Sequence, residues 1–278
     1  MSGLLSGLGL GDLENMDIFA DPSKKQEEKE AVQKPTVQEK DFLFEKAFVC
    51  PVCDAKFVNK IMRTGKAKLL GTDKDLRPVH EGIDTQKYDV LLCPQCGYAA
   101  LSRFFTQVTS TQAKFIKEQI SGKVQLHEAK GETYSYEDAI ERYKLALANA
   151  VVKRAKNSEK AYICLKSAWI FRGYAKQLEE ENPQANADKI REAHEMEEDY
   201  LQNAYKGFKE ANQTESFPMC GMDELTIDYL LAVLALRYKE YDTASKLVAA
   251  ILTSSTATPR IKDKARDLKE DILAEKKK

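Results

Sequence analysis

The sequence predicts a mostly helical α+β protein, in which a small four-cysteine zinc ribbon precedes an irregular tetratricopeptide-like helical repeat domain. Two Cys-x-x-Cys motifs, one beginning at Cys50 and one at Cys93, lie in the first part of the chain. Short apolar and β-branched segments flank both motifs, which is typical of strands. From about Thr109 onward, Glu, Lys, Ala, Leu and Gln dominate, and apolar residues recur at helical spacing.

The composition is that of a globular protein without a strong net charge. The 278 residues include 43 Lys and Arg and 44 Asp and Glu, which gives a net charge of −1. No global field therefore attracts the chain to nucleic acid or to a membrane. No apolar run approaches the roughly 20 residues that span a bilayer, and the N-terminus lacks the pattern of a secretory signal. We expect a cytoplasmic protein without membrane association.

The residue pattern divides the chain into three parts. Residues 1–40 are rich in Gly, Ser, Lys, Glu and Gln without an apolar period, so we expect a disordered tail. The run from Leu10 to Phe19 is a candidate docking motif within this tail, although a free tail is the simpler interpretation. We expect residues 41–108 to form the zinc-ribbon-like domain and residues 109–278 to form the helical domain.

The candidate metal ligands are Cys50, Cys53, Cys93 and Cys96. Two residues between paired thiols form a tight turn that directs both sulfurs at one Zn²⁺ ion about 2.3 Å away, so all four sulfurs should lie mutually within about 4 Å. A proline after the first cysteine of each pair presets the backbone of the turn. Gly97 follows the second pair, where a left-handed conformation is often needed, and Asp54 holds the matching place after the first.

Three interpretations of the four cysteines compete. A structural zinc site uses all four thiolates and leaves no open position for water or substrate, so it is favoured and argues against a catalytic metal. A redox dithiol is the alternative, because Cys-Pro-x-Cys also occurs in disulfide exchange, but two pairs without a βαβ unit disfavour it. Disulfides alone are disfavoured because nothing marks the chain as secreted.

Each cysteine pair is expected at the tip of a β-hairpin. The segments 47–49 and 56–58 flank the first pair, and 88–92 and 98–100 flank the second. The 39 residues between the pairs exceed the common ribbon spacing, so we expect an enlarged hairpin or an insertion there. Because so small a core holds little apolar area, the ion should supply much of its folding free energy.

The segment between the pairs also carries a basic run and a histidine. The basic residues are Lys56, Lys60, Arg63, Lys66 and Lys68, with no acidic residue until Asp73. Such a run could contact phosphates, but only Phe57 offers a ring for base stacking, so we favour a solvated face. Since four cysteines are already present, we expect His80 to pack or to face solvent rather than to bind the metal.

The helical part contains a loose internal repeat. Aromatic residues and alanines recur at the spacing of a second tetratricopeptide helix around Ala139, Ala204 and Ala244, and we expect these alanines to be buried. The intervals of 65 and 40 residues depart from the regular repeat of about 34. Helices near 161–178 and 222–237 should supply the first helix of a pair and line a concave surface for a protein or peptide. A plain helical bundle is the alternative.

Three segments around the cysteines share their pattern with a known family. They are Val49–Cys53, Glu81–Asp84 and Tyr88–Ala100. In these segments the chain resembles an uncharacterised bacterial family, domain of unknown function 2225. The resemblance implies a zinc-ribbon-like front, a helical tetratricopeptide-like back and a cytoplasmic bacterial protein, and it supplies no catalytic residue. Asp54, where many such turns carry Gly, is a mild departure.

We therefore expect a non-catalytic zinc-binding protein that serves as an interaction or scaffold protein. The chain carries no Walker loop, dinucleotide fingerprint, nucleophile elbow or His-Glu-x-x-His motif, so no catalytic residue is assigned. One alternative is a nucleic-acid-associated factor that uses the zinc ribbon and its basic hairpin. A second alternative is a thiol oxidoreductase.

Overall fold

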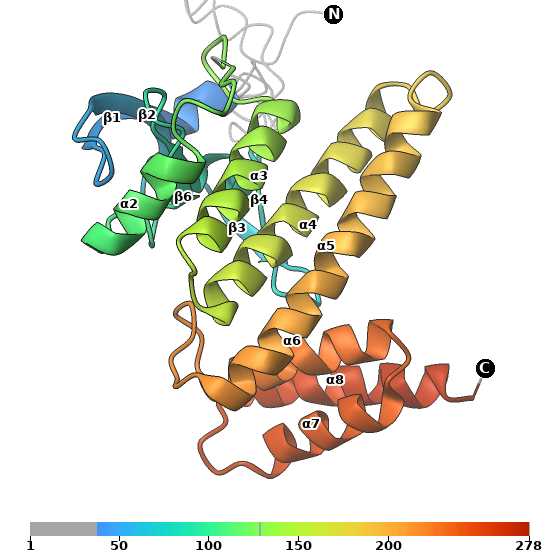
Figure 1. The fold of residues 1–278 in the computed structure, drawn as a ribbon. Coiled ribbons are helices and arrows are strands. Elements are labelled where there is room, and N and C mark those ends of the chain that lie inside the picture. Colours follow the sequence, from blue (N-terminus) through green and yellow to red (C-terminus); the bar gives the residue numbers. More distant parts are fainter. Residues whose placement is uncertain (1–37, 128, 278) are drawn as a thin grey trace, which may run out of the picture. The chain divides into compact units, whose positions relative to one another are not determined.

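The computed structural model describes residues 38–127 and 129–277, and within them the β-structure consists of three separate antiparallel hairpins (Figure 1). The hairpins are β1–β2 (Leu43–Val49 with Lys56–Met62), β3–β4 (Leu69–Thr72 with Pro78–His80) and β5–β6 (Val90–Leu92 with Ala99–Leu101). The first and third carry one cysteine pair each in their turns, which confirms the predicted hairpins. The β3–β4 hairpin is the insertion expected between the pairs. The candidate docking motif in residues 10–19 lies outside the described residues.

Two 3-10 helices connect these hairpins to the rest of the chain. The first is η2 (Glu39–Phe42), so the last two residues of the expected tail belong to a helical element. Glu39 accepts a hydrogen bond of 2.8 Å from the Tyr88 hydroxyl and pairs with Lys87 at 2.7 Å, and both contacts anchor η2 to η3. The second is η3 (Thr85–Tyr88), which begins after Asp84 because that carboxylate accepts the Gln86 amide at 3.1 Å.

Seven α-helices follow in the described residues. They are α2 (Ser110–Gln119), α3 (Tyr136–Val152), α4 (Asn157–Glu181), α5 (Ala187–Thr214), α6 (Glu224–Arg237), α7 (Tyr241–Thr253) and α8 (Pro259–Glu275). The change to helix comes where the composition predicts it, because Thr109 caps α2 with a reciprocal capping box to Gln112. Ser135, Asp223 and Thr258 cap α3, α6 and α8 through their side-chain oxygens.

The helices from α4 onward pack as neighbouring pairs. The antiparallel helices α4 and α5 lie side by side, α6 packs on α7, and α8 packs on both of these (Figure 1). Ala139, Ala204 and Ala244 are all fully buried, as predicted. A Cβ on Gly207 would come within 2.8 Å of the Ala161 Cβ, so the absence of a side chain there lets α5 approach α4.

The pairs do not by themselves establish a tetratricopeptide-like repeat. Helices α4 and α5 contain 25 and 28 residues, whereas a regular unit fits both of its helices into about 34. The fold is therefore described as a mostly helical α+β arrangement, with β-hairpins first and helices after them. None of the helices in the described part of the chain combines the length and apolarity needed to cross a bilayer.

The apolar cores run across the expected domain boundary. The largest cluster lies among α4 to α8 and contains Trp169 and Phe208. A second cluster joins Val90 and Leu101 of the β5–β6 hairpin to Tyr143 of α3 and to side chains of α4. Residues 39–278 accordingly form one compact unit. Separate folding of a zinc-ribbon-like domain and a helical domain stays a prediction.

Candidate metal centre

The turns of the β1–β2 and β5–β6 hairpins bring the four cysteine sulfurs into one cluster. Cys50 Sγ lies 3.6 Å from Cys96 Sγ, and Cys53 Sγ lies 3.7 Å from Cys93 Sγ. All four sulfurs lie within 4.8 Å of one another, slightly beyond the expected limit of about 4 Å. All four are free thiols. The two close distances match the edge, about 3.8 Å, of a tetrahedron with zinc–sulfur bonds of about 2.3 Å.

The two turns share one backbone geometry. In the first, the Cys50 amide donates to the Ala55 carbonyl and the Asp54 amide donates to the Cys50 carbonyl, both at 2.9 Å. In the second, the amides of Cys93 and Gly97 donate the equivalent bonds at 2.9 and 3.0 Å. Asp54 and Gly97 have φ angles of 61° and 72°, which confirms the left-handed conformation predicted after each pair. The Asp54 position shows that this turn does not require glycine.

Apolar side chains enclose most of the cluster. Cys50 and Cys93 are fully buried, Cys96 is nearly so, and Cys53 is partly exposed. Phe57 and other aliphatic and aromatic side chains pack around them. In such surroundings the attraction between a cation and thiolates is stronger than in water. The donor set and its burial suit a soft divalent ion with tetrahedral preference.

Side chains from α3 and from the turn after α2 hold the second cysteine turn in place, and no sequence motif marks them. Asn149 of α3 is fully buried, and its Nδ2 donates to the Gly97 carbonyl at 3.0 Å. The Ser121 hydroxyl donates to the Cys96 carbonyl at 3.1 Å. A Cβ on Gly97 would lie 3.3 Å from Ile120 Cγ2, so the glycine also serves close packing against the end of α2. These contacts join residues far apart in the chain, which explains why sequence reasoning missed them.

The thiols do not share one proton affinity. A hydrogen bond from Cys96 lowers the pKa of Cys50 to about 5, and the same bond raises the pKa of Cys96 well above its usual range. Burial raises the pKa of Cys93 to about 11. Without a cation, ionising all four sulfurs in this space is therefore unfavourable, because each new negative charge repels the others and is poorly solvated. A divalent ion removes that obstacle.

Comparison with protein families settles the relationship suggested by the cysteine segments. The family described as an uncharacterized protein conserved in bacteria, DUF2225, matches residues 43–272. The chain belongs to this family. The match extends from β1 into α8 and thus covers both the hairpins and the helices. Searches among curated proteins and among solved structures found no match.

The other candidate residues of this DUF2225 member lie outside the sulfur cluster. His80 ends β4, and its Nδ1 lies 3.3 Å from the Thr85 hydroxyl, so it is not among the four clustered ligands. Two cations of the basic run have local structural contacts. Lys60 lies over the Tyr134 ring at 4.9 Å, and Arg63 Nε donates to the Leu43 carbonyl at 2.9 Å. Reversing these two charges would disturb the hairpin itself.

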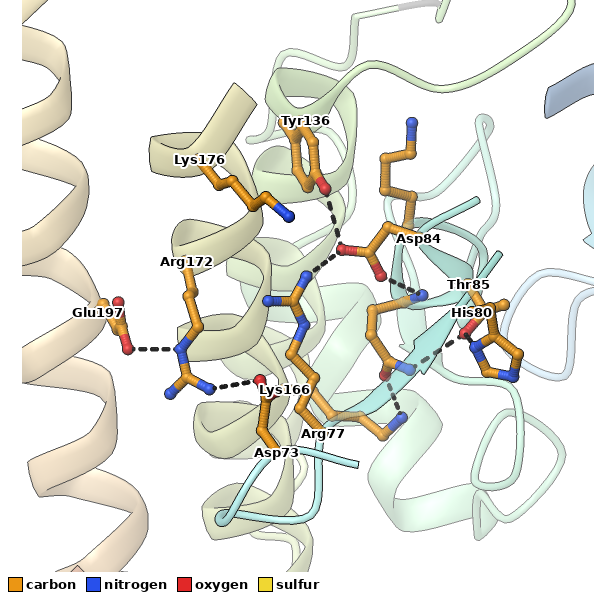
Figure 2. A network of polar contacts seen from close by, with 12 residues as sticks. Asp73, Arg77, His80, Asp84, Thr85, Tyr136, Lys166, Arg172, Lys176 and Glu197 are labelled. Carbon is orange, nitrogen blue, oxygen red and sulfur yellow. Dashed lines mark hydrogen bonds and ion pairs between the residues drawn. The ribbon is translucent and has the colours of Figure 1, made fainter. Parts of the chain in front are cut away.

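A polar network fastens the β3–β4 hairpin to the long helices (Figure 2). Arg172 of α4 donates to Asp73 at 3.0 Å, to Asp75 at 2.6 Å and to Glu197 of α5 at 2.8 Å. Asp75 and Glu197 are buried, and the Trp169 indole also donates to Asp75 at 3.1 Å. Burial alone would lower the pKa of Arg172, but the hydrogen bond and charge of Asp75 raise it, so the guanidinium stays charged. One guanidinium thus joins three carboxylates, two from the β3–β4 turn and one from α5, and the network has the character of a structural clamp.

A second branch of the network holds the start of η3 (Figure 2). Asp84 accepts hydrogen bonds from Arg77 at 2.8 Å and from the Tyr136 hydroxyl at 3.0 Å. Tyr136 reaches this carboxylate because Gly173 leaves space beside it. A Cβ on Gly173 would lie 2.5 Å from the Tyr136 hydroxyl oxygen. Glycine in the middle of a helix lowers the intrinsic stability of α4, but at this position it leaves the space that the Tyr136 side chain occupies.

Proposed function

We propose that this chain is a non-catalytic zinc-binding protein in which one Zn²⁺ ion, held by Cys50, Cys53, Cys93 and Cys96, stabilises the two cysteine-bearing hairpins. The observation that carries the proposal is the sulfur cluster, with close pairs at 3.6 and 3.7 Å in two matching turns. A four-thiolate shell is closed, so the ion serves folding rather than substrate activation. Thiolate ligation fits a reducing compartment, in agreement with the proposed cytoplasmic location.

Elemental analysis tests the metal assignment directly. Protein purified without chelator should contain close to one zinc per chain, and Cys53→Ser should remove most of it. Cys220→Ser is the matched control, because Cys220 lies outside the cluster and its thiol donates a hydrogen bond to the Ser158 carbonyl. A metal-free protein with intact hairpins would contradict the proposal. That result, with the thiols cycling between free and disulfide forms, would instead favour the thiol oxidoreductase alternative.

We further propose that the helical part acts as an irregular tetratricopeptide-like platform for a protein or peptide. Helices α6 and α7, with 14 and 13 residues, have lengths suited to such a unit, and alanines lie between the paired helices. The surface differs from the one expected at first. From Ala161 to Phe171, α4 has no exposed residue, and only Glu224 and Arg237 of α6 are exposed, so these helices offer little contact area. The outer faces of α5, α7 and α8 are the better candidates.

A binding experiment with one altered face tests the platform. Tagged full-length protein and a Glu195→Lys/Asp199→Lys variant should be compared by affinity capture and mass spectrometry, because both acids are exposed on α5. A partner of this face should be recovered less with the variant, while the melting temperature stays within about 2 °C. Equal recovery of every protein would move the proposed interface away from α5.

The nucleic-acid alternative requires variants that leave the hairpin intact. Lys56, Lys66 and Lys68 are exposed, whereas Lys60 and Arg63 hold local contacts. A salt-dependent shift of labelled DNA or RNA that is lost in the Lys56→Glu/Lys66→Glu variant would favour this alternative. If the zinc-loaded protein shifts neither DNA nor RNA, the nucleic-acid alternative is excluded.

A further inference from the structure

A cavity of about 640 Å³ lies between the β1–β2 hairpin, η3 and α4. None of the four clustered cysteines lines it, so it is distinct from the metal centre. Its size falls within the range of about 300–1,000 Å³ that is usual for small-molecule sites. Both the hairpin part and the helical part contribute walls, and the site is incomplete without either of them.

A buried lysine forms the polar end of this cavity. The Lys166 side chain extends from α4 and is only 9% exposed. Its ammonium donates to Gln86 Oε1 at 2.7 Å and lies 2.8 Å from Asp89 Oδ2. Burial alone would lower the pKa of Lys166, but Asp89 and Tyr162 raise it, so the group is charged. An ammonium has three donors, and the described residues supply two hydrogen-bond acceptors for them, beside the Tyr162 and Trp169 rings at 5.1 and 5.6 Å.

Two further cations border the cavity without a carboxylate partner among the described residues. Arg103 lies over the Tyr162 ring at 5.5 Å, and Lys46 lies over the Phe48 ring at 5.5 Å. Asp89 is the one acidic residue of the described lining, and its charge is matched by Lys166. The cavity therefore carries an excess of positive charge that no protein group in its lining neutralises.

An apolar wall faces these cations. It is formed by Phe48 and Ile61 of the β1–β2 hairpin, by Leu91 and by Tyr162. We propose that this cavity binds a small organic anion, with its phosphate or carboxylate on Lys166 and Arg103 and its ring or apolar body against Phe48 and Ile61. Both anionic groups suit the same cations, and the apolar wall excludes a bare inorganic ion as the best ligand.

The neighbouring cavity of about 430 Å³ provides an internal contrast. It also contains a half-buried cation, Arg77, and a buried one, Lys87, but each has its own carboxylate. Arg77 pairs with Asp84 at 2.8 Å, and Lys87 pairs with Glu39 at 2.7 Å. A buried cation is therefore common to both cavities and does not by itself mark a ligand site. The larger cavity differs because its lining contains more cations than carboxylates.

Calorimetric titration of the full-length, zinc-loaded protein tests the proposal with four probes. Adenosine monophosphate and benzoate carry both a ring and an anionic group, inorganic phosphate carries only the charge, and adenosine carries only the ring. We expect at least one ring-bearing anion to bind at least about tenfold more tightly than phosphate or adenosine. A further titration with phenyl phosphate, which has the same ring as benzoate, identifies the anionic group by its affinity relative to benzoate.

Three variants assign the binding to this cavity. Lys166→Met should weaken the preferred probe by at least about tenfold, since a charge-assisted hydrogen bond is lost. Lys87→Met is the matched control, because it removes an equally buried ammonium from the neighbouring cavity and should leave the affinity unchanged. If Lys166→Met fails to fold, the Lys46→Gln/Arg103→Gln variant decides, because neither side chain has an ion-pair partner in the described residues. No binding at about 1 mM probe, or unchanged affinity in the double variant, would overturn the proposal.

Discussion

Compared with helices α4 to α8, the two cysteine-bearing hairpins have few apolar side chains to bury. The cluster around the sulfurs contains 11 buried residues, of which three are cysteines and two come from the end of α2. The cluster among α4 to α8 contains 24 buried residues. Apolar burial can thus stabilise the helices directly, whereas the hairpins need an additional source of free energy. A bound ion is the source that the four sulfurs are arranged to accept.

The surroundings of the sulfurs and the junction between the β3–β4 hairpin and the long helices also differ in the kind of polar contact that stabilises them. Around the sulfurs, the polar contacts are backbone bonds within the turns and side-chain bonds to their carbonyls. Among the β3–β4 hairpin, α4 and α5, the contacts are partly buried ion pairs centred on Arg172. The comparison predicts that loss of the metal unfolds the cysteine-bearing hairpins and spares the helices. Loss of the Arg172 ion pairs should instead weaken the junction between the β3–β4 hairpin and the long helices.

The largest effect is expected from Cys53→Ser. A structural zinc in small domains contributes about 10–16 kcal/mol of apparent binding free energy, so its loss should unfold the hairpins. Far-UV circular dichroism should keep most of its helical signal, while limited proteolysis within residues 56–90 accelerates. Cys220→Ser should change neither measurement. Because β5–β6 shares its apolar cluster with α3, collapse of the whole helical signal would show that the two regions fold as one unit.

A smaller effect is expected from Arg172→Met. This change leaves the Asp75 and Glu197 carboxylates buried without their cation, which commonly costs about 3–5 kcal/mol. Thermal or urea unfolding should report the loss, with the zinc content unchanged. Arg191→Met is the control, because its pair with Asp188 is exposed and should be worth less than about 1 kcal/mol. Equal stability of the two variants would show that the clamp does not join the regions.

Overpacking of the helical core should have the next effect. Ala204 is fully buried in the core cluster of α4 to α8, so Ala204→Trp should destabilise by about 1–3 kcal/mol. The same change at exposed Ala249 of α7 should be nearly neutral. Melting temperatures of the two variants give the comparison. A silent Ala204→Trp would mean that the helices do not pack as paired units at this site.

The smallest effect concerns protons rather than stability. At pH 7, a preformed metal-free cluster already holds Cys50 as thiolate, because its pKa is lowered to about 5, while Cys93 and Cys96 are protonated. Zinc uptake should then release at least two protons and at most three. If the metal-free hairpins are unfolded, the four thiols have pKa values of about 8.5 and release close to four. An indicator dye in weakly buffered solution measures the count, and zinc affinity should fall as the pH is lowered.

Much of this organisation could be predicted from short-range sequence patterns. The hairpin strands, the left-handed residues Asp54 and Gly97, and the helical region after Thr109 all follow from neighbouring residues. The grouping of the four sulfurs follows from two similar turns that need a common partner. The surface of the helical part could not be predicted in the same way. Local periodicity identified the helix near 161–178, but not that its faces are almost all covered.

The sequence by itself determined the cysteine turns, because each turn is closed by backbone hydrogen bonds between residues at most five positions apart. Only the tertiary structure decided which distant groups support or neighbour them. Asn149 reaches the Gly97 carbonyl, and Lys166 and Arg103 come together around one cavity. These contacts depend on how helix faces and hairpins pack, and the free energy of that packing is summed over many side chains. No single local motif encodes it.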